Sequence, residues 1–283
     1  MAGRTAATAR RLRLAAELRK LRERAGLTAT EAAAAVGTSS GQLSNVETAR
    51  FGVSADRVRA MAHAYSCCDQ ALVDALAGMA GDRTKGWWEL YRDVLPPGLL
   101  DLSELEHHAG ALRTAYTAHM PGLLQTADHA RVVFRQVVPE LSPPEIEHRV
   151  SHRIKRQEVL YRADPTPYRT IVHEAALRME FGGRQVARQQ LDHVLRMAEL
   201  DHVQVLVIPF AVGAFPGSGQ SIGYASGPVP QLDTVHLDQS HGPVLLDAES
   251  QLAKYRTLLD RMEATALGAE KSREFIRTLL RNL

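Results

Sequence analysis

Signals that start and stop helices follow one another at short intervals in the first quarter of the chain, so this region can form only short helices. A first helix is predicted over residues 11–25, where apolar residues recur at helical spacing until Gly26. Those apolar residues are Leu14, Leu18 and Leu21. Thr28, with Glu31 three positions later, forms a capping-box pattern that predicts a second, very short helix ending at Gly37.

A third and a fourth helix follow the turn at Gly37. Ser39 can cap the third, in which Leu43 and Val46 are three apart and face inward. Its outward positions are Ser40, Gln42, Ser44 and Asn45. Ser54 can cap the fourth helix. The buried stripe of that helix is Val58, Met61 and Tyr65. Four or five short helices with a tight turn between the second and third are typical of a helix-turn-helix domain.

Charge is unevenly placed along the chain. The 283 residues have a formal net charge of +2, yet residues 1–65 contain eleven Lys and Arg against five Asp and Glu. This excess of +6 leaves −4 for the remainder, which makes nucleic acid a candidate partner for the N-terminal quarter alone. Arg4, Arg10, Arg11 and Arg13 form either a basic arm that lies along DNA phosphates or a solvated terminus.

Several classes of protein are disfavoured by the composition. Apolar runs are too short for a membrane span, and the first residues lack the pattern of a secretory signal. The two cysteines, Cys67 and Cys68, are adjacent and cannot form an ordinary disulfide framework, which fits a reducing compartment. We therefore expect a cytoplasmic protein without a membrane partner, associated with the nucleoid when it is bound to DNA.

The residues between these helix signals also resemble a known family. The stretch LTATEAAAAVGTSSGQLSNVE has a short helix, a Gly-containing turn, a recognition helix and a Glu near its end, in the order of Xre/lambda-repressor-like proteins. The resemblance covers Leu12 to Tyr65 and implies a five-helix domain whose recognition helix lies in the major groove of double-stranded DNA. By position it implies base contacts from Ser40, Gly41, Ser44 and Asn45, phosphate contacts from Ser39, Gln42 and Arg50, and Thr28 as a further DNA-binding residue.

Three positions within this stretch depart from what a helix or the family would favour. Gly41 lies inside the third helix, where a glycine costs about 1 kcal/mol relative to alanine, and its small size would let the helix approach a groove closely. Ala29 occupies a place where the family often has Gln, which removes one polar contact to DNA. Ala49 stands where the family usually has Gly, and a positive φ there would be strained.

The rest of the chain predicts a second, larger domain. GDRTKG, at residues 81–86, combines two glycines with charge and follows a helical tract that ends at Ala80, so we expect a helix-turn-helix domain over 1–80, a linker over 81–86 and a second domain over 87–283. Residues 87–137 look mainly helical, and a long amphipathic helix is predicted over 144–162.

Strands are expected in the second half of this domain. VQVLVIPF, at 203–210, has the clearest strand pattern, and shorter strands are predicted in YRTIVH, QSIGYAS, DTVHLD and GPVLLD. Two closing helices are predicted over 249–266 and 269–281. The expected architecture is mainly α with a small mixed or antiparallel sheet, α+β overall.

A second resemblance concerns this larger domain. PGLLQTADHAR, RQEVL, VHEAALRMEFGG, QLDHVLRMAE and VLVIPFAVGAFPG occur in the order seen in WhiJ-like, antitoxin-like bacterial regulators that join an Xre head to such a domain. The resemblance spans Trp87 to Leu280 and implies a transcription factor, in a family often encoded beside a small protein partner. It implies no known chemistry.

Two patterns of catalytic or metal-binding type occur in the second domain. GQSIG, at 219–223, fits the G-x-S-x-G pattern with Asp233 and His241 downstream, but a nucleophile elbow needs a strand before the Ser and a helix directly after it. His148 and His152, at i and i+4, could share a metal with Glu145, although a solvated helix face has the same pattern. We expect no enzyme, no cofactor and no metal.

The sequence thus favours a sequence-specific transcriptional regulator. Because one recognition helix contacts few base pairs, we expect a homodimer on an inverted repeat, with the second domain dimerising and sensing a ligand or a small partner protein. The alternative is an antitoxin-like protein that mainly sequesters a small partner, with autoregulatory DNA binding. A hydrolase built on Ser221 is a third, weaker hypothesis.

Overall fold

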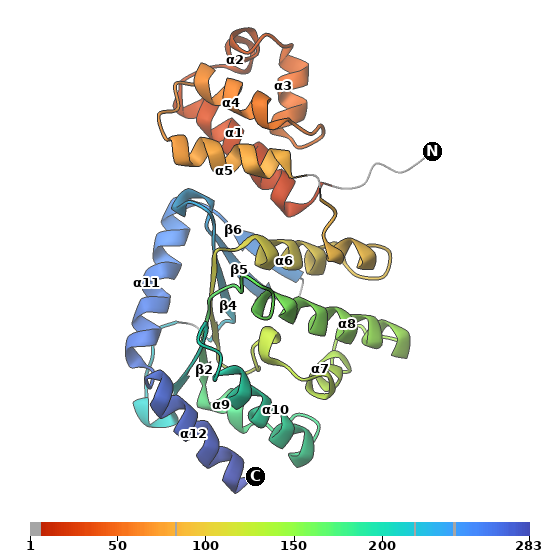
Figure 1. Cartoon of the computed structure of the whole chain (residues 1–283), viewed down its shortest axis with the longest axis vertical. Coiled ribbons are helices and arrows are strands. Elements are labelled where there is room, and N and C mark those ends of the chain that lie inside the picture. Colours follow the sequence, from red (N-terminus) through yellow and green to blue (C-terminus); the bar gives the residue numbers. More distant parts are fainter. Residues whose placement is uncertain (1–6, 83, 218, 240–241) are drawn as a thin grey trace. The chain divides into compact units, whose positions relative to one another are not determined.

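The computed structural model describes residues 7–82, 84–217, 219–239 and 242–283, and the chain divides into two compact units, Met1–Trp87 and Trp88–Leu283. The first unit is helical (Figure 1). Its helices are α1 (Ala9–Arg24), α2 (Ala29–Ala35), α3 (Ser40–Glu47), α4 (Ala55–Ala64) and α5 (Gln70–Gly81). These bounds confirm the five-helix prediction.

Every helix of the first unit begins at a side chain that caps it. In each case the cap oxygen accepts a hydrogen bond from the backbone N–H three residues later, which satisfies one otherwise unpaired donor of the first turn. The caps are Thr8, Thr28, Ser39, Ser54 and Asp69. Because helices of 7 or 8 residues are marginal in isolation, these caps and the shared core around Leu18 and Leu76 stabilise them together.

The described part of the N-terminus does not form the basic arm that was one of the two alternatives. Arg11 and Arg13 lie inside α1, as the helix predicted over 11–25 implies, and Arg10 joins them because Thr8 starts the helix earlier than the apolar pattern indicates. Arg13 forms an ion pair with Glu17 at 2.8 Å on the same helix. Arg4 lies outside the described residues.

The second unit is built on a six-stranded mixed sheet with the order β3-β2-β1-β4-β5-β6. Three strands, β1 to β3, are parallel, and β4, β5 and β6 continue the sheet antiparallel from β1. The strands are β1 (Ala111–Tyr116), β2 (Tyr168–His173), β3 (Val203–Ile208), β4 (Ile222–Ser226), β5 (Thr234–Gln239) and β6 (Gly242–Leu246). The mixed alternative of the sequence prediction, and the α+β class, are therefore confirmed.

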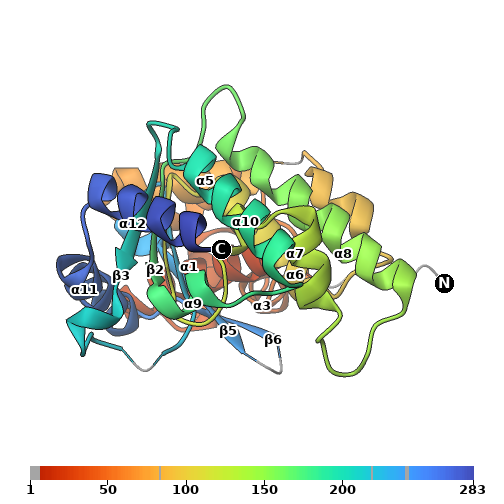
Figure 2. The same cartoon turned by 90° about the horizontal axis from the view of Figure 1, so that it is seen from below.

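Helices cover both faces of this sheet, as Figures 1 and 2 show. One face packs against α11, with Leu259 fully buried, and the other packs against helices of the parallel crossovers and against α12. The helices of this unit are α6 (Pro97–His108), α7 (Ala127–Phe134), α8 (Pro143–Arg156), α9 (Glu174–Arg178), α10 (Arg184–Met197), α11 (Glu249–Thr265) and α12 (Ala269–Asn282). Parallel neighbours need such long crossovers, which is why α7 and α8 separate β1 from β2, and α9 and α10 separate β2 from β3.

Two expectations for this unit are wrong in detail. Residues 87–137 were expected to be mainly helical, yet 111–116 form β1, the strand between the parallel and antiparallel parts of the sheet. ALRTAY contains one β-branched residue, so pairing with two neighbouring strands outweighs its weak local preference. The helix expected over 144–162 ends at Arg156 and continues as a 3₁₀ turn, Gln157–Leu160.

Two histidines of the second unit are buried and neutral. His129 in α7 is 2% exposed, its ring lies 5.2 Å from that of Phe181, and neither ring nitrogen has a hydrogen-bond partner among the described residues. Burial, with smaller contributions from His119 and Arg153, lowers the pKa of His129 to about 4. For His152, which lies 2.8 Å from the Ser103 hydroxyl, burial lowers the pKa to about 3.

We expect the second unit to lose stability as the pH falls from 7 towards 4, because the unfolded chain then binds protons that these folded histidines do not. His129→Leu should lessen the loss between pH 7 and pH 5 by about 2 kcal/mol. Urea unfolding followed by tryptophan fluorescence measures this, since both tryptophans lie at 87 and 88. His148→Leu, at an exposed position of α8, is the control, and an equal change in both variants would contradict the assignment.

Candidate nucleic-acid interface

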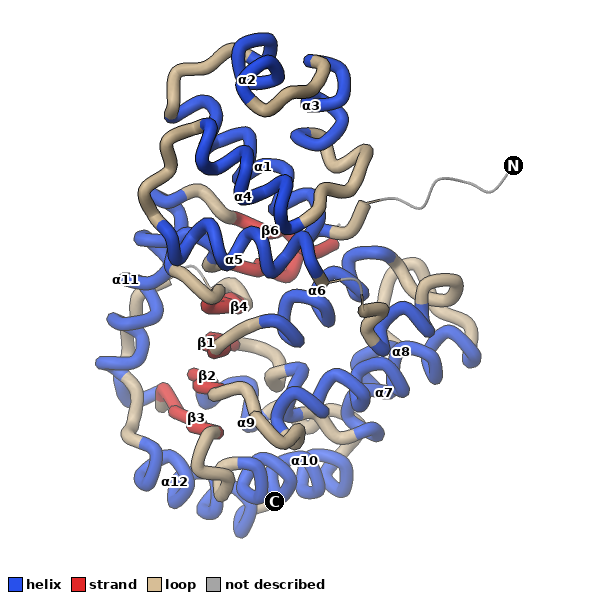
Figure 3. The backbone as a smooth tube through the Cα atoms, turned by 45° about the horizontal axis from the view of Figure 1, so that its top comes forward, coloured by secondary structure: helices blue, strands red, loops and turns tan. Residues whose placement is uncertain are grey.

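Helices α2 and α3 lie next to each other in the first unit and are joined by a tight turn (Figure 3). The backbone N–H of Gly37 donates to the carbonyl of Ala34 at 3.1 Å, and that of Thr38 donates to Ala33 at 2.8 Å. Gly37 has a φ of 65°, which only glycine adopts without strain. The turn thus ends α2 and starts α3 within four residues, as a helix-turn-helix requires.

Helix α3 has one buried side and one exposed side. Leu43 is 2% exposed and anchors the helix, while Ser40, Gly41, Gln42 and Ser44 are exposed and Asn45 is half-buried. The Ser39 hydroxyl accepts from the backbone of Gln42 at 3.2 Å, and the Thr38 hydroxyl donates to the Gln42 side-chain oxygen at 2.6 Å. The exposed side therefore presents small polar groups and an amide that is fixed by its neighbour.

A buried ion pair attaches the C-terminal end of α3 to α1. The guanidinium of Arg22 contacts both carboxylate oxygens of Glu47, Nε to Oε1 at 2.7 Å and Nη2 to Oε2 at 2.9 Å. Its third nitrogen donates to the carbonyl of Leu27 at 2.8 Å, just before α2. The hydrogen bonds that Arg22 donates to Glu47 raise the pKa of Arg22, and the two side chains are 11% and 6% exposed. One guanidinium thus fixes α3 relative to both α1 and the start of α2.

Ala49 ends α3 in a strained conformation, as the departure from glycine predicted. Its φ is 54°, and its side chain is 5% exposed. The backbone N–H of Ala49 donates to Val46, and its carbonyl accepts from Arg11 at 3.4 Å. A left-handed conformation costs a non-glycine residue about 1 kcal/mol, so packing and these bonds offset that strain.

Gly41 is different, because nothing inside the chain requires a glycine there. Its backbone φ is not positive, and a β-carbon built at this position would meet no atom within 4 Å. An alanine would fit and would favour the helix by about 1 kcal/mol. Packing and backbone conformation within the first unit therefore do not account for a glycine at this position.

The remaining predicted residues lie at the edges of this surface. Arg50 is exposed and follows the end of α3 by three residues. Thr28 is exposed, but its hydroxyl is engaged in a capping box, since it accepts from the backbone of Glu31 and donates to its carboxylate at 2.7 Å. Sequence reasoning missed Arg22 and Thr38. The Glu near the end of α3 was a usable signal for the first, because a carboxylate that is buried needs a cation.

The catalytic and metal patterns lack the necessary geometry. Ser221 lies directly before β4, so a strand follows it where a nucleophile elbow has a helix. The Asp233 carboxylate instead accepts from the hydroxyl of Tyr224 at 2.6 Å and from the backbone of Gly227 at 2.9 Å, while His241 lies outside the described residues. His148 is exposed, whereas the His152 ring is buried with its Nε2 2.8 Å from the Ser103 hydroxyl, so the two rings are not directed at a common metal position.

Each of the two units matches a known protein family. A helix-turn-helix domain matches residues 13–76, and a domain of unknown function, DUF5753, matches residues 99–278, well over half of the chain. The chain belongs to the DUF5753 family. Its N-terminal helix-turn-helix domain is of the kind found in DNA-binding regulators. No curated protein and no solved structure matches this DUF5753 chain. None of the described helices is both long and apolar enough to cross a membrane.

We expect Glu47→Gln to destabilise the first unit of this DUF5753 protein by about 3 kcal/mol, because Arg22 would keep its charge in a buried position with only the half-exposed carboxylate of Glu23, 3.8 Å away, as a counterion. Urea unfolding monitored by circular dichroism measures the loss. The matched control is Asp74→Asn, which removes an exposed pair with Arg59 and should change stability by less than about 0.5 kcal/mol. Equal effects of both substitutions would show that the Arg22 pair does not position α3.

Proposed function

We propose that this protein is a sequence-specific transcriptional regulator of the Xre/lambda-repressor-like type that binds double-stranded DNA through α3. The observation that supports this most is the exposed side of α3, which combines small polar side chains with a glycine that the unit itself does not need. Excess positive charge over residues 1–65 favours a polyanionic partner on the same unit.

In this proposal the residues of α3 divide by the part of DNA they contact. Ser40, Ser44 and Asn45 can donate and accept at base edges, and Gly41 lets the helix backbone approach the groove. Ser39, Gln42 and Arg50 are positioned nearer the phosphates, with Arg50 supplying charge. Thr28, whose hydroxyl is engaged by Glu31, contributes by starting α2 at the right place more than by contacting DNA.

The proposal includes a homodimer on an inverted repeat. An α3 of 8 residues is about 12 Å long, so one copy contacts too few base pairs for selectivity. We assign residues 1–80 to DNA binding, 81–86 to a linker, and 87–283 to dimerisation and to sensing of a ligand or a small partner protein. The division of the chain into compact units around Trp87 and Trp88 supports this assignment.

The proposal is tested by binding of the purified protein to DNA from upstream of its own gene and to a scrambled duplex over a range of salt concentrations. Selective, salt-dependent binding is expected. Binding without selectivity, together with a tight complex with the product of a neighbouring gene, would instead favour the antitoxin-like, WhiJ-like alternative, in which sequestration of a small partner is the main activity.

Gly41→Ala should raise the unfolding free energy of the first unit by about 1 kcal/mol and weaken selective DNA binding about tenfold, because its methyl group would stand between the helix and the groove. Gly78→Ala is the matched control, as Gly78 lies inside α5 with no atom within 4 Å of a built β-carbon. It should stabilise equally and leave DNA binding unchanged. Unchanged binding of the Gly41→Ala variant would show that α3 does not approach the groove closely.

Ser44→Ala and Asn45→Ala should each weaken binding to the specific duplex by about 1–3 kcal/mol and hardly change binding to the scrambled duplex. Arg50→Ala should weaken both and lower the dependence of log affinity on log salt by about 1, since it removes a phosphate contact. Fluorescence anisotropy titrations at several salt concentrations distinguish the two behaviours. Equal losses on both duplexes for all three variants would contradict the placement of α3.

A further inference from the structure

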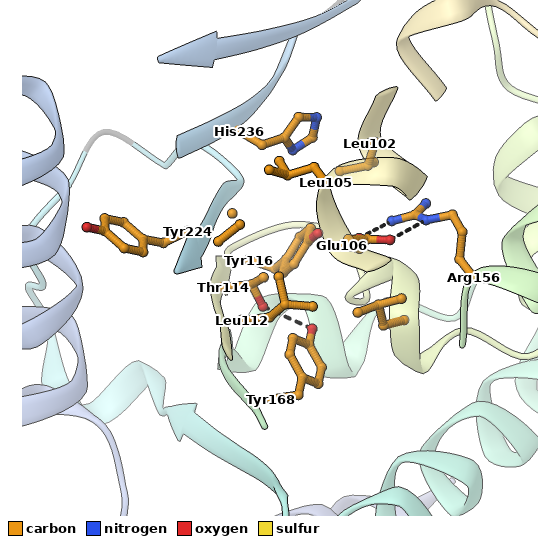
Figure 4. A pocket seen from close by; sticks show the side chains of 13 residues that line it. Leu102, Leu105, Glu106, Leu112, Thr114, Tyr116, Arg156, Tyr168, Tyr224 and His236 are labelled. Carbon is orange, nitrogen blue, oxygen red and sulfur yellow. Dashed lines mark hydrogen bonds and ion pairs between the residues drawn. The ribbon is translucent and has the colours of Figure 1, made fainter. Parts of the chain in front are cut away.

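A cavity of about 40 Å³ lies between the sheet of the second unit and the helices α6 and α8 (Figure 4). Its walls come from those two helices, from the loop after β1 and from strands β1, β2, β4 and β5. This volume exceeds that of one water molecule and suits the headgroup of a small compound. The side chains that line the cavity determine which class of compound can bind there.

The sheet face that borders the cavity is unusually polar for a buried surface. Adjacent strands place Thr114, Tyr168 and Thr170 on this face, with Thr114 opposite Thr170 in the register. The Thr114 hydroxyl lies 3.0 Å from the Tyr168 hydroxyl and donates to Thr170 at 2.8 Å, which fixes the tyrosine ring. On the opposite face the same two strands carry the apolar Ala115 and Ile171, together with Arg113 and Arg169, which form ion pairs with α11. The buried hydroxyl groups of these two strands are thus on the cavity side.

Arg156 borders the cavity and is 5% exposed. Two of its nitrogens contact Glu106 of α6, Nε to Oε2 at 2.8 Å and Nη2 to Oε1 at 2.5 Å. Its Nη1 has no hydrogen-bond partner within the described ranges. The ion pair therefore fixes the guanidinium and leaves one donor group for another acceptor.

Two further polar groups reach the same space. Tyr116 of β1 and His236 of β5 line the cavity, and neither side chain has a hydrogen-bond partner among the residues that the structure describes. Burial lowers the pKa of His236, so its neutral ring offers one N–H and one acceptor nitrogen. The unpaired groups at this wall, Nη1 of Arg156, the Tyr116 hydroxyl and the His236 ring, are mainly donors.

Charged groups of both signs surround the cavity. Arg153, one turn before Arg156 on α8, donates to the neutral amide of Gln125 at 2.7 Å and lies 4.8 Å from the centre of the Phe134 ring. Burial, followed by repulsion from Arg156, lowers the pKa of Arg153 to about 10. The two guanidinium groups of α8 are thus balanced by two carboxylates, the buried Glu106 and the exposed Asp238, and Arg153 itself makes no ion pair among the described residues.

We propose that this cavity binds the carboxylate of a small organic acid. Arg156 and Tyr116 donate to the carboxylate oxygens, with His236 as a further donor, and Leu102 and Leu105 of α6 contact a short alkyl remainder. A carboxylate fits because it accepts several hydrogen bonds and the free groups of the wall are mainly donors. A role for such an acid as the signal of a transcriptional regulator rests on the function proposed above. The binding of the acid to the cavity does not depend on DNA binding.

The test uses the full-length protein without DNA and measures the dissociation constants of acetate and butyrate by saturation-transfer NMR titration. Acetamide and butyramide are the matched neutral probes. We expect each acid to bind about tenfold more tightly than its amide, since charge-assisted hydrogen bonds are the stronger kind. Equal affinities of acid and amide, or no saturable binding of either acid, would overturn the proposal and leave a cavity filled by water.

Substitutions then locate the site. Tyr116→Phe should weaken acid binding about tenfold, while Tyr255→Phe, which removes a hydroxyl on α11 at the opposite face of the sheet, should have no effect. Gly223→Ala places a methyl group at ordinary contact distance, 3.6 Å, from His236 and should weaken binding at least about fivefold without lowering the Tm. Unchanged acid binding in both the Tyr116 and the Gly223 variant would place the acid elsewhere and overturn the assignment.

DNA binding is measured on the same samples, so that a failure of the proposed DNA-binding function can be distinguished from a failure of the proposed acid site. Loss of acid binding in the Tyr116→Phe variant with unchanged selectivity for the upstream duplex supports the cavity as an independent site. Acid binding by a protein that shows no selectivity for DNA would overturn the proposed function and leave the cavity assignment intact. A shift in DNA affinity on addition of the acid, absent in Tyr116→Phe, would identify the acid as the signal.

Discussion

The backbone pairing of β1 is the constraint on which the second unit depends. This strand runs parallel to β2 on one side and antiparallel to β4 on the other, so both halves of the sheet are joined through its hydrogen bonds. The two faces of β1 also contact different parts of the second unit. Arg113 on one face contacts Asp260 and Glu263 of α11, while Thr114 on the other borders the cavity beneath α6. The attachment of α11 and the proposed acid site therefore both follow from one six-residue strand.

Sequence patterns that act over a few residues predicted the helices of the first unit but did not predict β1. Both outcomes depend on how far along the chain the stabilising partners lie. A cap such as Ser39 or Thr28 acts within three residues, so its effect is visible in the sequence around it. The stability of β1 comes from partners 54 or more residues away, and ALRTAY by itself favours no strand. The strands with strong patterns, above all Val203–Ile208, were predicted because they are rich in β-branched residues that suit a buried sheet.

In the candidate DNA surface, too, local sequence patterns did not reveal the contacts between distant residues. The exposed residues of α3 could be predicted from helical spacing, but their orientation depends on Arg22 and Glu47, which are 25 residues apart. Ala49 and Gly41 are both residues that their backbone positions do not favour, but the structure accounts for only one of them. The strain at Ala49 is explained by contacts inside the unit, whereas no internal contact explains Gly41. For that reason Gly41 is informative about a partner and Ala49 is not.

The position of the Arg22 to Glu47 ion pair has a mechanical consequence for α3. Because the pair lies at the C-terminal end of the helix, that end acts as a pivot, and the N-terminal end at Ser40 is about 10 Å away along the axis. A tilt of about 10° would displace Ser40 by about 2 Å, more than the tolerance of a hydrogen bond. If α3 binds DNA as proposed above, substitutions at buried residues of α1, such as Leu18 and Leu21, would alter which base pairs α3 reaches although these residues do not approach DNA themselves.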